Sequence, residues 1–308
     1  MDALQAIILG IVQGITEFLP ISSTGHIRVI PALAGWPDPG APFTAAIQLG
    51  TLLAVLIYFR SELALAFRGW VGSFRREKGT PLGPDAKMGW AIFWGTIPIS
   101  ILGFALKDQI EGDFRSLYVV AGMLIGIGLL MGAAEVIGSK KRALDSVRPV
   151  DGLWVGLWQC IALIPGASRS GSTMTGAMFF GFDRSTAAKF SFLLSVPAIF
   201  LAGVFQIAEH RDVFFGPQAG VVILANVAAF MSGYASIAFL LKFLATKSSW
   251  IFIIYRLLLG VALLILLQQG ILRPMDGEAP TKSAQYGAHS VVCLDENQSS
   301  PRFLPSGS

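Results

Sequence analysis

The stretch of sequence that decides the fold spans residues 18–26 and reads FLPISSTGH. It places a proline, a glycine and three hydroxyl residues in the middle of an apolar segment, residues 3–33. A second apolar segment, residues 152–181, is interrupted in the same way at residues 164–173 by IPGASRSGST. Each half is too short to cross a hydrocarbon layer of about 30 Å. Both segments therefore predict re-entrant helix–loop–helix hairpins, whose loops must be covered by protein or line a wet cavity.

The rest of the composition indicates a polytopic membrane protein. Of the 308 residues, 54% are hydrophobic and only 14% are charged, whereas a soluble domain carries about 25% charged residues. Six further segments are apolar enough to span a membrane: residues 43–59, 88–106, 117–137, 190–208, 219–241 and 250–267. We therefore predict an all-α membrane protein with six spanning helices plus the two hairpins, and we exclude a water-soluble enzyme.

The basic residues predict how the chain is oriented in the membrane. Of the 23 Lys and Arg residues, 14 fall in four alternate loops, at 60–87, 138–150, 182–189 and 242–249. The positive-inside rule places these loops in the cytoplasm and both termini outside. The net charge of +4 is thereby explained without a nucleic-acid partner. In this topology the first hairpin enters from the outer face and the second from the cytoplasmic face.

The two interrupted segments also resemble each other in sequence. A shift of 146 positions aligns Gly10 with Gly156, Gln13 with Gln159, Ser22 with Ser168, and Gly25 with Gly171. Together with the opposite orientations, this match predicts an inverted repeat, about 1–137 and 150–271, with a binding site between the halves near the midplane. We expect a single membrane domain over 1–271 and a disordered polar tail over 272–308.

The first break carries the elements of a nucleophilic site. Gln13 and Glu17 are four residues apart and share one helix face, and Ser23 and His26 are three apart. A hydroxyl next to a base is the minimal unit for nucleophilic attack. The alternative is structural, since Glu17 and His26 could satisfy each other and the free backbone groups of the break.

The second break indicates an anion site. Arg169 lies among small hydroxyl residues and a glycine, at a helix start whose N–H groups and dipole favour anions. A guanidinium also fits phosphate oxygens in a fixed fork. Arg169 could instead reach toward the interface or pair with Glu17. Including residues of the first break, we expect the following to bind substrate: Gln13, Ser22, Thr24, Ser168, Ser170, Gly171, Ser172 and Thr173.

Three other ionisable residues in apolar segments have simpler interpretations. We expect Arg256 to extend toward the cytoplasmic interface, because it lies about one and a half turns from its helix end. Glu135 is close to Lys140, which favours a surface ion pair. Arg28 is expected to reach the outer interface.

Two opposed hairpins that bring these breaks together would suit a phosphorylated lipid, whose tail can stay in the membrane. The chain contains neither a GxxxxGK[ST] loop nor HExxH, and three His residues are too few for a His-rich metal site. Two other functions stay open: a secondary transporter or flippase, because broken helices in inverted repeats are typical of transporters, and a lipid-phosphate receptor without catalysis.

The sequences at 13–26, QGITEFLPISSTGH, and 165–173, PGASRSGST, resemble the two signature motifs of the bacitracin-resistance family of undecaprenyl-diphosphate phosphatases. The likeness runs from about residue 3 to residue 268 and includes FSFLLSVP at 190–197 and the pair Tyr255 and Arg256. It implies hydrolysis of undecaprenyl diphosphate in the bilayer to undecaprenyl phosphate and phosphate. That reaction recycles the lipid carrier of peptidoglycan and confers bacitracin resistance. The resemblance implies the bacterial inner membrane, with the active site toward the outer face.

The resemblance also assigns roles by position. Glu17, Ser23, His26 and Arg169 match the family's functional residues, and a divalent cation, Mg²⁺ or Ca²⁺, is implied. Gln13 matches a position that holds Glu or Gln in the family. Because it is an amide here, Glu17 is the single carboxylate this helix offers as a metal ligand.

We expect Ser23 to attack the terminal phosphorus while Glu17 or His26 accepts its proton. His26 as nucleophile, or water activated by Glu17, are the alternatives. A homodimer is left open.

Overall fold

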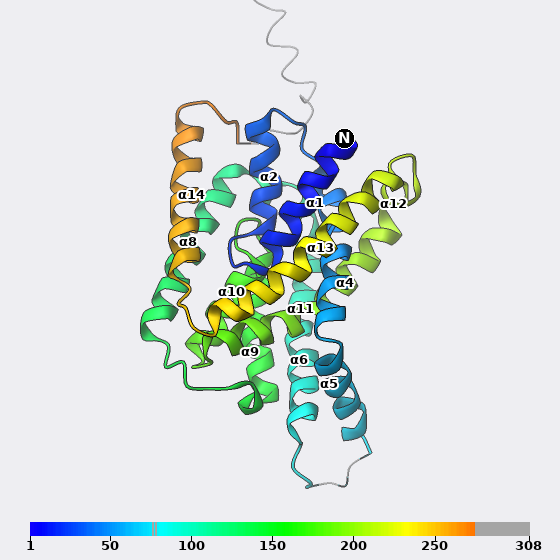
Figure 1. Ribbon diagram of the computed structural model, residues 1–308, viewed down its shortest axis with the longest axis vertical. Helices are drawn as coiled ribbons and strands as arrows, with labels where there is room; N and C mark the ends of the chain where they lie inside the picture. The colour runs from blue at the N-terminus through cyan, green and yellow to red at the C-terminus, as the bar shows by residue number, and fades with distance from the viewer. Residues whose placement is uncertain (76, 78, 275–308) are drawn as a thin grey trace, which may run out of the picture.

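The computed structural model describes residues 1–75, 77 and 79–274, and within them every regular element is helical (Figure 1). The α-helices are α1 (Ala3–Phe18), α2 (Ser23–Ala34), α3 (Gly40–Ala46), α4 (Gln48–Tyr58), α5 (Arg60–Ser73), α6 (Pro84–Ala105), α7 (Lys107–Glu111), α8 (Leu117–Ile137), α9 (Pro149–Cys160), α10 (Arg169–Phe179), α11 (Arg184–Glu209), α12 (Arg211–Phe215), α13 (Ala219–Leu244) and α14 (Trp250–Gln268). Three short 3₁₀ turns are η1 (Asp113–Arg115), η2 (Leu144–Ser146) and η3 (Ile161–Leu163).

The prediction of six spanning helices is confirmed for the part of the chain that the structure describes. Six units are long and apolar enough to cross a membrane: α3 with α4 as one unit (Gly40–Tyr58), then α6, α8, α11, α13 and α14. The largest boundary difference is at α11, which begins at Arg184 rather than residue 190. Asp183 caps it by accepting a hydrogen bond from Thr186 N at 2.9 Å, so a polar first turn precedes the apolar stretch.

The two interrupted segments each fold as two short helices with a break between them. α1 has 16 residues and α9 has 12, so at 1.5 Å per residue they are about 24 and 18 Å long. In Figure 1, α1 and α2 occupy the upper half of the molecule, and α9 and α10 the lower half. The loops after α5 and after α8 lie at the lower end, while the N-terminus and the end of α14 lie at the upper end.

Close backbone packing holds the first helix of each interrupted segment, α1 and α9, in place. α1 packs along α13, and α9 packs along α6. A Cβ on Gly10 would lie 2.3 Å from Ala225 O, and one on Gly156 would lie 2.4 Å from Gly95 O. Glycine at these positions therefore lets the backbones touch, as is common where helices associate in membranes. The breaks between the short helices are held at the centre of the bundle.

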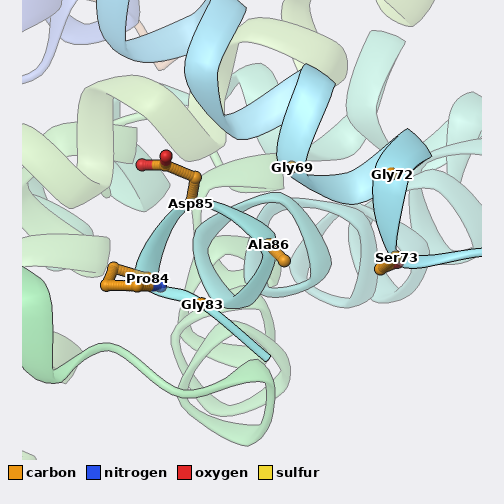
Figure 2. A pocket seen from close by; sticks show the side chains of 7 residues that line it. All are labelled: Gly69, Gly72, Ser73, Gly83, Pro84, Asp85 and Ala86. Carbon is orange, nitrogen blue, oxygen red and sulfur yellow. The ribbon is translucent and has the colours of Figure 1, made fainter. Parts of the chain in front are cut away.

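The lower end of the molecule carries a separate cavity between α5 and the start of α6 (Figure 2). Its volume is about 320 Å³, and its lining is Gly69, Gly72, Ser73, Gly83, Pro84, Asp85 and Ala86. This lining contains one carboxylate and one hydroxyl but no basic side chain. It therefore offers little to a phosphorylated ligand. The expected tail lies almost wholly outside the described residues, and the single-domain assignment stays a prediction.

Candidate active site

The tips of the two interrupted segments meet through an ion pair. Glu17 lies in the last turn of α1, Arg169 is the first residue of α10, and Arg169 Nη2 donates to Glu17 Oε1. Both side chains are largely shielded from solvent. Two stretches that are 152 positions apart in sequence therefore face each other, with an acid on one side and a guanidinium on the other.

The other oxygen of Glu17 contacts the hydroxyl of the first break. Ser23 Oγ donates to Glu17 Oε2 at 2.6 Å, and Gln13 Nε2 donates to the same oxygen at 2.9 Å. Ser23 begins α2, so the break folds it back over the end of α1. A carboxylate at this distance can accept the hydroxyl proton as the oxygen attacks an electrophile. The geometry thus places a hydroxyl group against a carboxylate.

The His26 ring forms its hydrogen bonds with groups other than Ser23, although the spacing predicted that the two side chains would share a helix face. Its Nδ1 lies 2.7 Å from Ser22 O, and its Nε2 lies 2.6 Å from Tyr255 Oη. A carbonyl only accepts, so Nδ1 carries the proton and Nε2 accepts from the tyrosine hydroxyl. Within the described chain these are the hydrogen-bond partners of the His26 ring, and Ser23 is bonded to Glu17 instead. The role of His26 in catalysis stays a prediction.

Hydroxyl groups of the second break join it to the first. Ser170 Oγ donates toward Glu17 O and Leu19 O, each at 3.2 Å. In the reverse direction, Thr24 Oγ1 accepts from Gly166 N at 3.3 Å. Several predicted substrate-binding residues thus serve the contact between the tips.

The predicted substrate-binding residues divide into two groups. Thr24 and Ser168 line one cavity together with Glu17, Ser23 and Arg169. The remaining members lie behind the cavity wall: Gln13, Ser22, Ser170, Gly171, Ser172 and Thr173. Thr173 Oγ1, for example, lies 2.5 Å from Ser191 Oγ on α11. This second group supports the tips rather than facing the cavity.

The cavity itself joins a polar end to an apolar one. Its volume is about 480 Å³, in the range of pockets that hold small organic ligands. Glu17, Ser23 and Arg169 form a polar region, and apolar side chains from the C-terminal halves of α6 and α11 form an apolar one. Further polar groups also line the cavity, among them Arg28, Lys107, Arg115 and Gln206. An amphipathic ligand with an anionic head matches this distribution.

The position of Arg256 differs most from what the sequence predicted. It was expected to extend toward the interface, but it is 0% exposed. Its guanidinium donates to Pro20 O at 3.2 Å in the first break, and to Gly166 O at 3.0 Å and Ala167 O at 2.9 Å in the second. It therefore binds both breaks through their carbonyl groups. A lone arginine in a spanning helix is the signal that could have found it.

One further expectation about a charged residue is wrong. Glu135 is buried and pairs with Arg184, and it accepts from Ser249 Oγ at 2.5 Å, whereas a surface pair was expected. Arg28 is buried and pairs with Asp38, ten residues later, which also accepts from Arg115 at 2.5 Å. Its position relative to the membrane interface stays a prediction.

The donors for a cation are few. Among the residues described, no group of three or more His, Cys, Asp and Glu side chains could hold a metal ion. Gln13 Oε1, however, is fully buried without a hydrogen-bond partner, one helical turn from Glu17. Amide and carboxylate oxygens are ligands that Mg²⁺ and Ca²⁺ accept, and Mg²⁺ sites often add only substrate phosphates and water. Of these two residues only Glu17 lines the cavity, so Glu17 is the residue that fits such an ion next to substrate phosphates.

The chain is similar to proteins of a known family over most of its length. A sequence model of the family described as bacitracin resistance protein BacA matches residues 6–262. A protein of Myxococcus xanthus named undecaprenyl-diphosphatase is 50% identical over 282 residues, which cover 90% of this chain and 93% of that protein. Proteins of the same name from Chlorobium limicola and Chloroherpeton thalassium are 50% and 49% identical, each over 88% of this chain and over 99% and 98% of their own lengths.

Proposed function

The chain belongs to the bacitracin resistance protein BacA family, and from this membership and the geometry of the site we infer that it hydrolyses undecaprenyl diphosphate. The products are undecaprenyl phosphate and phosphate, so the enzyme recycles the lipid carrier of cell-wall synthesis. The family name implies bacitracin resistance. The structural observation that carries this function is the contact of one carboxylate, Glu17, with both Ser23 and Arg169.

Ser23 is the nucleophile in the mechanism that the geometry favours. Its Oγ forms a bond to the terminal phosphorus while the bond from that phosphorus to the bridging oxygen breaks, and undecaprenyl phosphate leaves. Glu17, bonded to Oγ at 2.6 Å, accepts the proton. Glu17 passes that proton to the departing undecaprenyl phosphate or to solvent. Water then attacks the phosphoserine while Glu17 accepts a proton from it, and Glu17 returns this proton to Ser23 Oγ as the bond from Oγ to phosphorus breaks and phosphate is released.

Arg169 binds the phosphate groups. A guanidinium has five donors in a fixed fork, so Arg169 can keep its contact with Glu17 while other N–H groups bind phosphate oxygens. Ser168 lies on the same cavity wall and adds a hydroxyl. These donors also stabilise the negative charge that spreads over the transferred phosphoryl group in the transition state.

The alternatives from the sequence are His26 as nucleophile and water activated directly by Glu17. The ring nitrogens of His26 are bonded to Ser22 O and Tyr255 Oη, which supports Ser23 over His26. Direct attack by water would use the same Glu17 carboxylate and would leave no phosphoserine.

A divalent cation, Mg²⁺ or Ca²⁺, is part of the proposal. Glu17, which lines the cavity, would hold it together with substrate oxygens and water, and it would supply neutralising charge next to the phosphates. Removal of divalent ions with a chelator is expected to lower phosphate release, and added Mg²⁺ or Ca²⁺ to restore it. Full activity in chelator would remove the cation from the account.

The placement in the membrane is also proposed. Two re-entrant hairpins in an inverted repeat, one from each leaflet, are supported by the matched packing of α1 on α13 and α9 on α6. They are further supported by the basic loops at one end of the molecule and both described chain ends at the other (Figure 1). In this arrangement the enzyme lies in the bacterial inner membrane and its cavity faces outward.

The test is phosphate release from undecaprenyl diphosphate by the purified protein in detergent, with Glu17→Gln beside wild type. Glu62→Gln, at an exposed position on α5, is the matched control. We expect release by wild type and by the control, and almost none by Glu17→Gln. A flippase or a receptor would release no phosphate in this assay. The proposed function would be contradicted if wild type released no phosphate, or if Glu17→Gln released it at the wild-type rate.

A further inference from the structure

The apolar end of the catalytic cavity opens sideways. Phe104 of α6 and Leu201 and Phe205 of α11 line the cavity, yet they are 76%, 49% and 39% exposed. A side chain that both lines a cavity and is exposed lies at the edge of its opening. Both α6 and α11 are long and apolar enough to cross a membrane, so an opening between them would face lipid.

The two helices that flank the opening touch below it. At mid-height a Cβ on Gly95 of α6 would lie 2.6 Å from Leu194 Cδ1 of α11. One turn further out, from Ile99 and Ala198 onward, the cavity lies between them. Each helix has a proline at this level, Pro98 and Pro197, which removes one helical hydrogen bond and lets the two axes diverge.

Polar and aromatic contacts close the gap at its outer end. Lys107 forms an ion pair with Glu209, and its ammonium lies 5.4 Å from the centre of the Phe205 ring. The rings of Phe104 and Phe205 meet edge to face at 6.4 Å. Glu209 lies four residues beyond Phe205, about 6 Å along the helix. The charged pair therefore marks the water side, and the opening below it lies at the depth of the hydrocarbon.

We propose that the gap between the outer halves of α6 and α11 is the passage for the isoprenoid chain of the substrate. This proposal rests on the proposed function and adds where the chain leaves the site. The head must reach Glu17 and Ser23, while a long apolar chain must stay out of water. A cavity of about 480 Å³ is of the size that holds a small ligand, so most of an undecaprenyl chain has to lie outside it.

Small residues keep the passage open. A Cβ on Gly103 of α6 would meet only Leu163 Cδ2, at 3.5 Å, and Ala202 faces the same cavity from α11. Larger side chains at these two positions would fill the passage without touching Glu17, Ser23 or Arg169. The length of the isoprenoid chain should therefore decide how strongly such a variant is impaired.

The test compares two substrates, undecaprenyl diphosphate and the short-chain farnesyl diphosphate, in detergent. For Ala202→Phe we expect kcat/KM to fall by about tenfold more for the long chain than for the short chain. Ala208→Phe, exposed on α11 but outside the cavity, should leave the ratio of the two substrates at the wild-type value. An unchanged ratio in Ala202→Phe would overturn the passage.

A second pair of variants approaches the passage from the opposite helix. Gly103→Leu should lower the long-chain to short-chain ratio in the same way, whereas Gly122→Leu, on an open part of α8 with nothing within 4 Å, should not. This pair keeps the proposal testable if Ala202→Phe does not fold. Inactivity of wild type on both substrates would reject the proposed function, whereas an active enzyme with unchanged ratios in folded variants would reject the passage alone.

Discussion

The breaks at the tips of the two interrupted segments, around Ser22 and Ser168, contain the same backbone turn but carry different side chains. Ser22 and Ser168 both have positive φ angles, 77° and 70°, and both accept a hydrogen bond from the glycine three residues later. The next residue begins a helix in each case, Ser23 in α2 and Arg169 in α10, and both side chains contact Glu17. The same strained turn therefore aims a nucleophile from one side and a cation from the other at one carboxylate.

The difference between the tips lies in what has no counterpart. At the 146-residue shift, Glu17 corresponds to Leu163 and His26 to Ser172. Only the first tip thus contains an acid and an imidazole, while the second supplies donors. The comparison teaches that matching backbone turns can present different side chains to one site; in the proposed mechanism the first half transfers protons and the second binds the anion.

Removal of the nucleophile should have the largest effect. Ser23→Ala deletes the attacking oxygen from the first tip and is expected to lower kcat by at least about a thousandfold. Phosphate release from undecaprenyl diphosphate measures this, with Ser61→Ala on the exposed face of α5 as the control. A loss below about tenfold would assign the attack to another group.

The second tip is tested by a change that keeps its charge. Arg169→Lys retains a cation but loses the planar fork, so we expect kcat/KM to fall by about a hundredfold. The kcat/KM of Arg169→Ala should be lower than that of Arg169→Lys. Arg68→Lys, at an exposed position, should match wild type. Equal activity of lysine and arginine at position 169 would mean that charge alone matters at this tip.

Arg256 donates hydrogen bonds to both breaks, so we expect it to hold the two tips together. Arg256→Met leaves the carbonyls of Pro20, Gly166 and Ala167 without their buried donor. At about 1–3 kcal/mol for an unsatisfied buried group, we expect the unfolding midpoint in detergent to fall by about 5 °C or more. Activity should fall by about tenfold, since both tips lose their shared support.

Arg60→Met, at an exposed position on α5, is the control for that variant. Should Arg256→Met unfold at the wild-type temperature, the guanidinium would not be holding the tips together. Reduced activity at an unchanged midpoint would instead indicate a direct effect on the site.

The smallest effect is expected from loss of the hydrogen bond between Tyr255 and His26. Tyr255→Phe removes one hydrogen bond to Nε2 while keeping the stacked ring. A single such bond is worth about 1 kcal/mol, so kcat should change by no more than about fivefold. A loss as large as that of Ser23→Ala would show that the tyrosine–histidine pair takes part in the chemistry itself.

Hydropathy and helix breakers were sufficient to predict the spans and the two breaks. The apolar content of the six spans is local, and the proline, glycine and hydroxyl residues of FLPISSTGH disfavour one continuous helix. The meeting of Glu17 with Arg169 was also accessible, because loop charges oriented the two segments toward each other.

What the sequence could not supply were contacts between distant segments. Arg256 binds carbonyls 90 and 236 positions away, and backbone acceptors leave no mark on composition. Glu135 likewise finds Arg184 through the fold, although Lys140 is nearer in sequence. His26 contacts Tyr255 of α14, 229 positions away, and spacing along α2 does not reveal such a contact.

The most direct test of the central claim, that Glu17 activates Ser23 against a phosphate held by Arg169, is a single-turnover quench analysed by peptide mass spectrometry. Acid quench preserves phosphoserine, and alkaline quench preserves phosphohistidine. The account predicts phosphate on Ser23 in wild type within one turnover, and none on that peptide in Ser23→Ala. Complete turnover with Ser23 unmodified at every time point, or phosphate on His26, would contradict it.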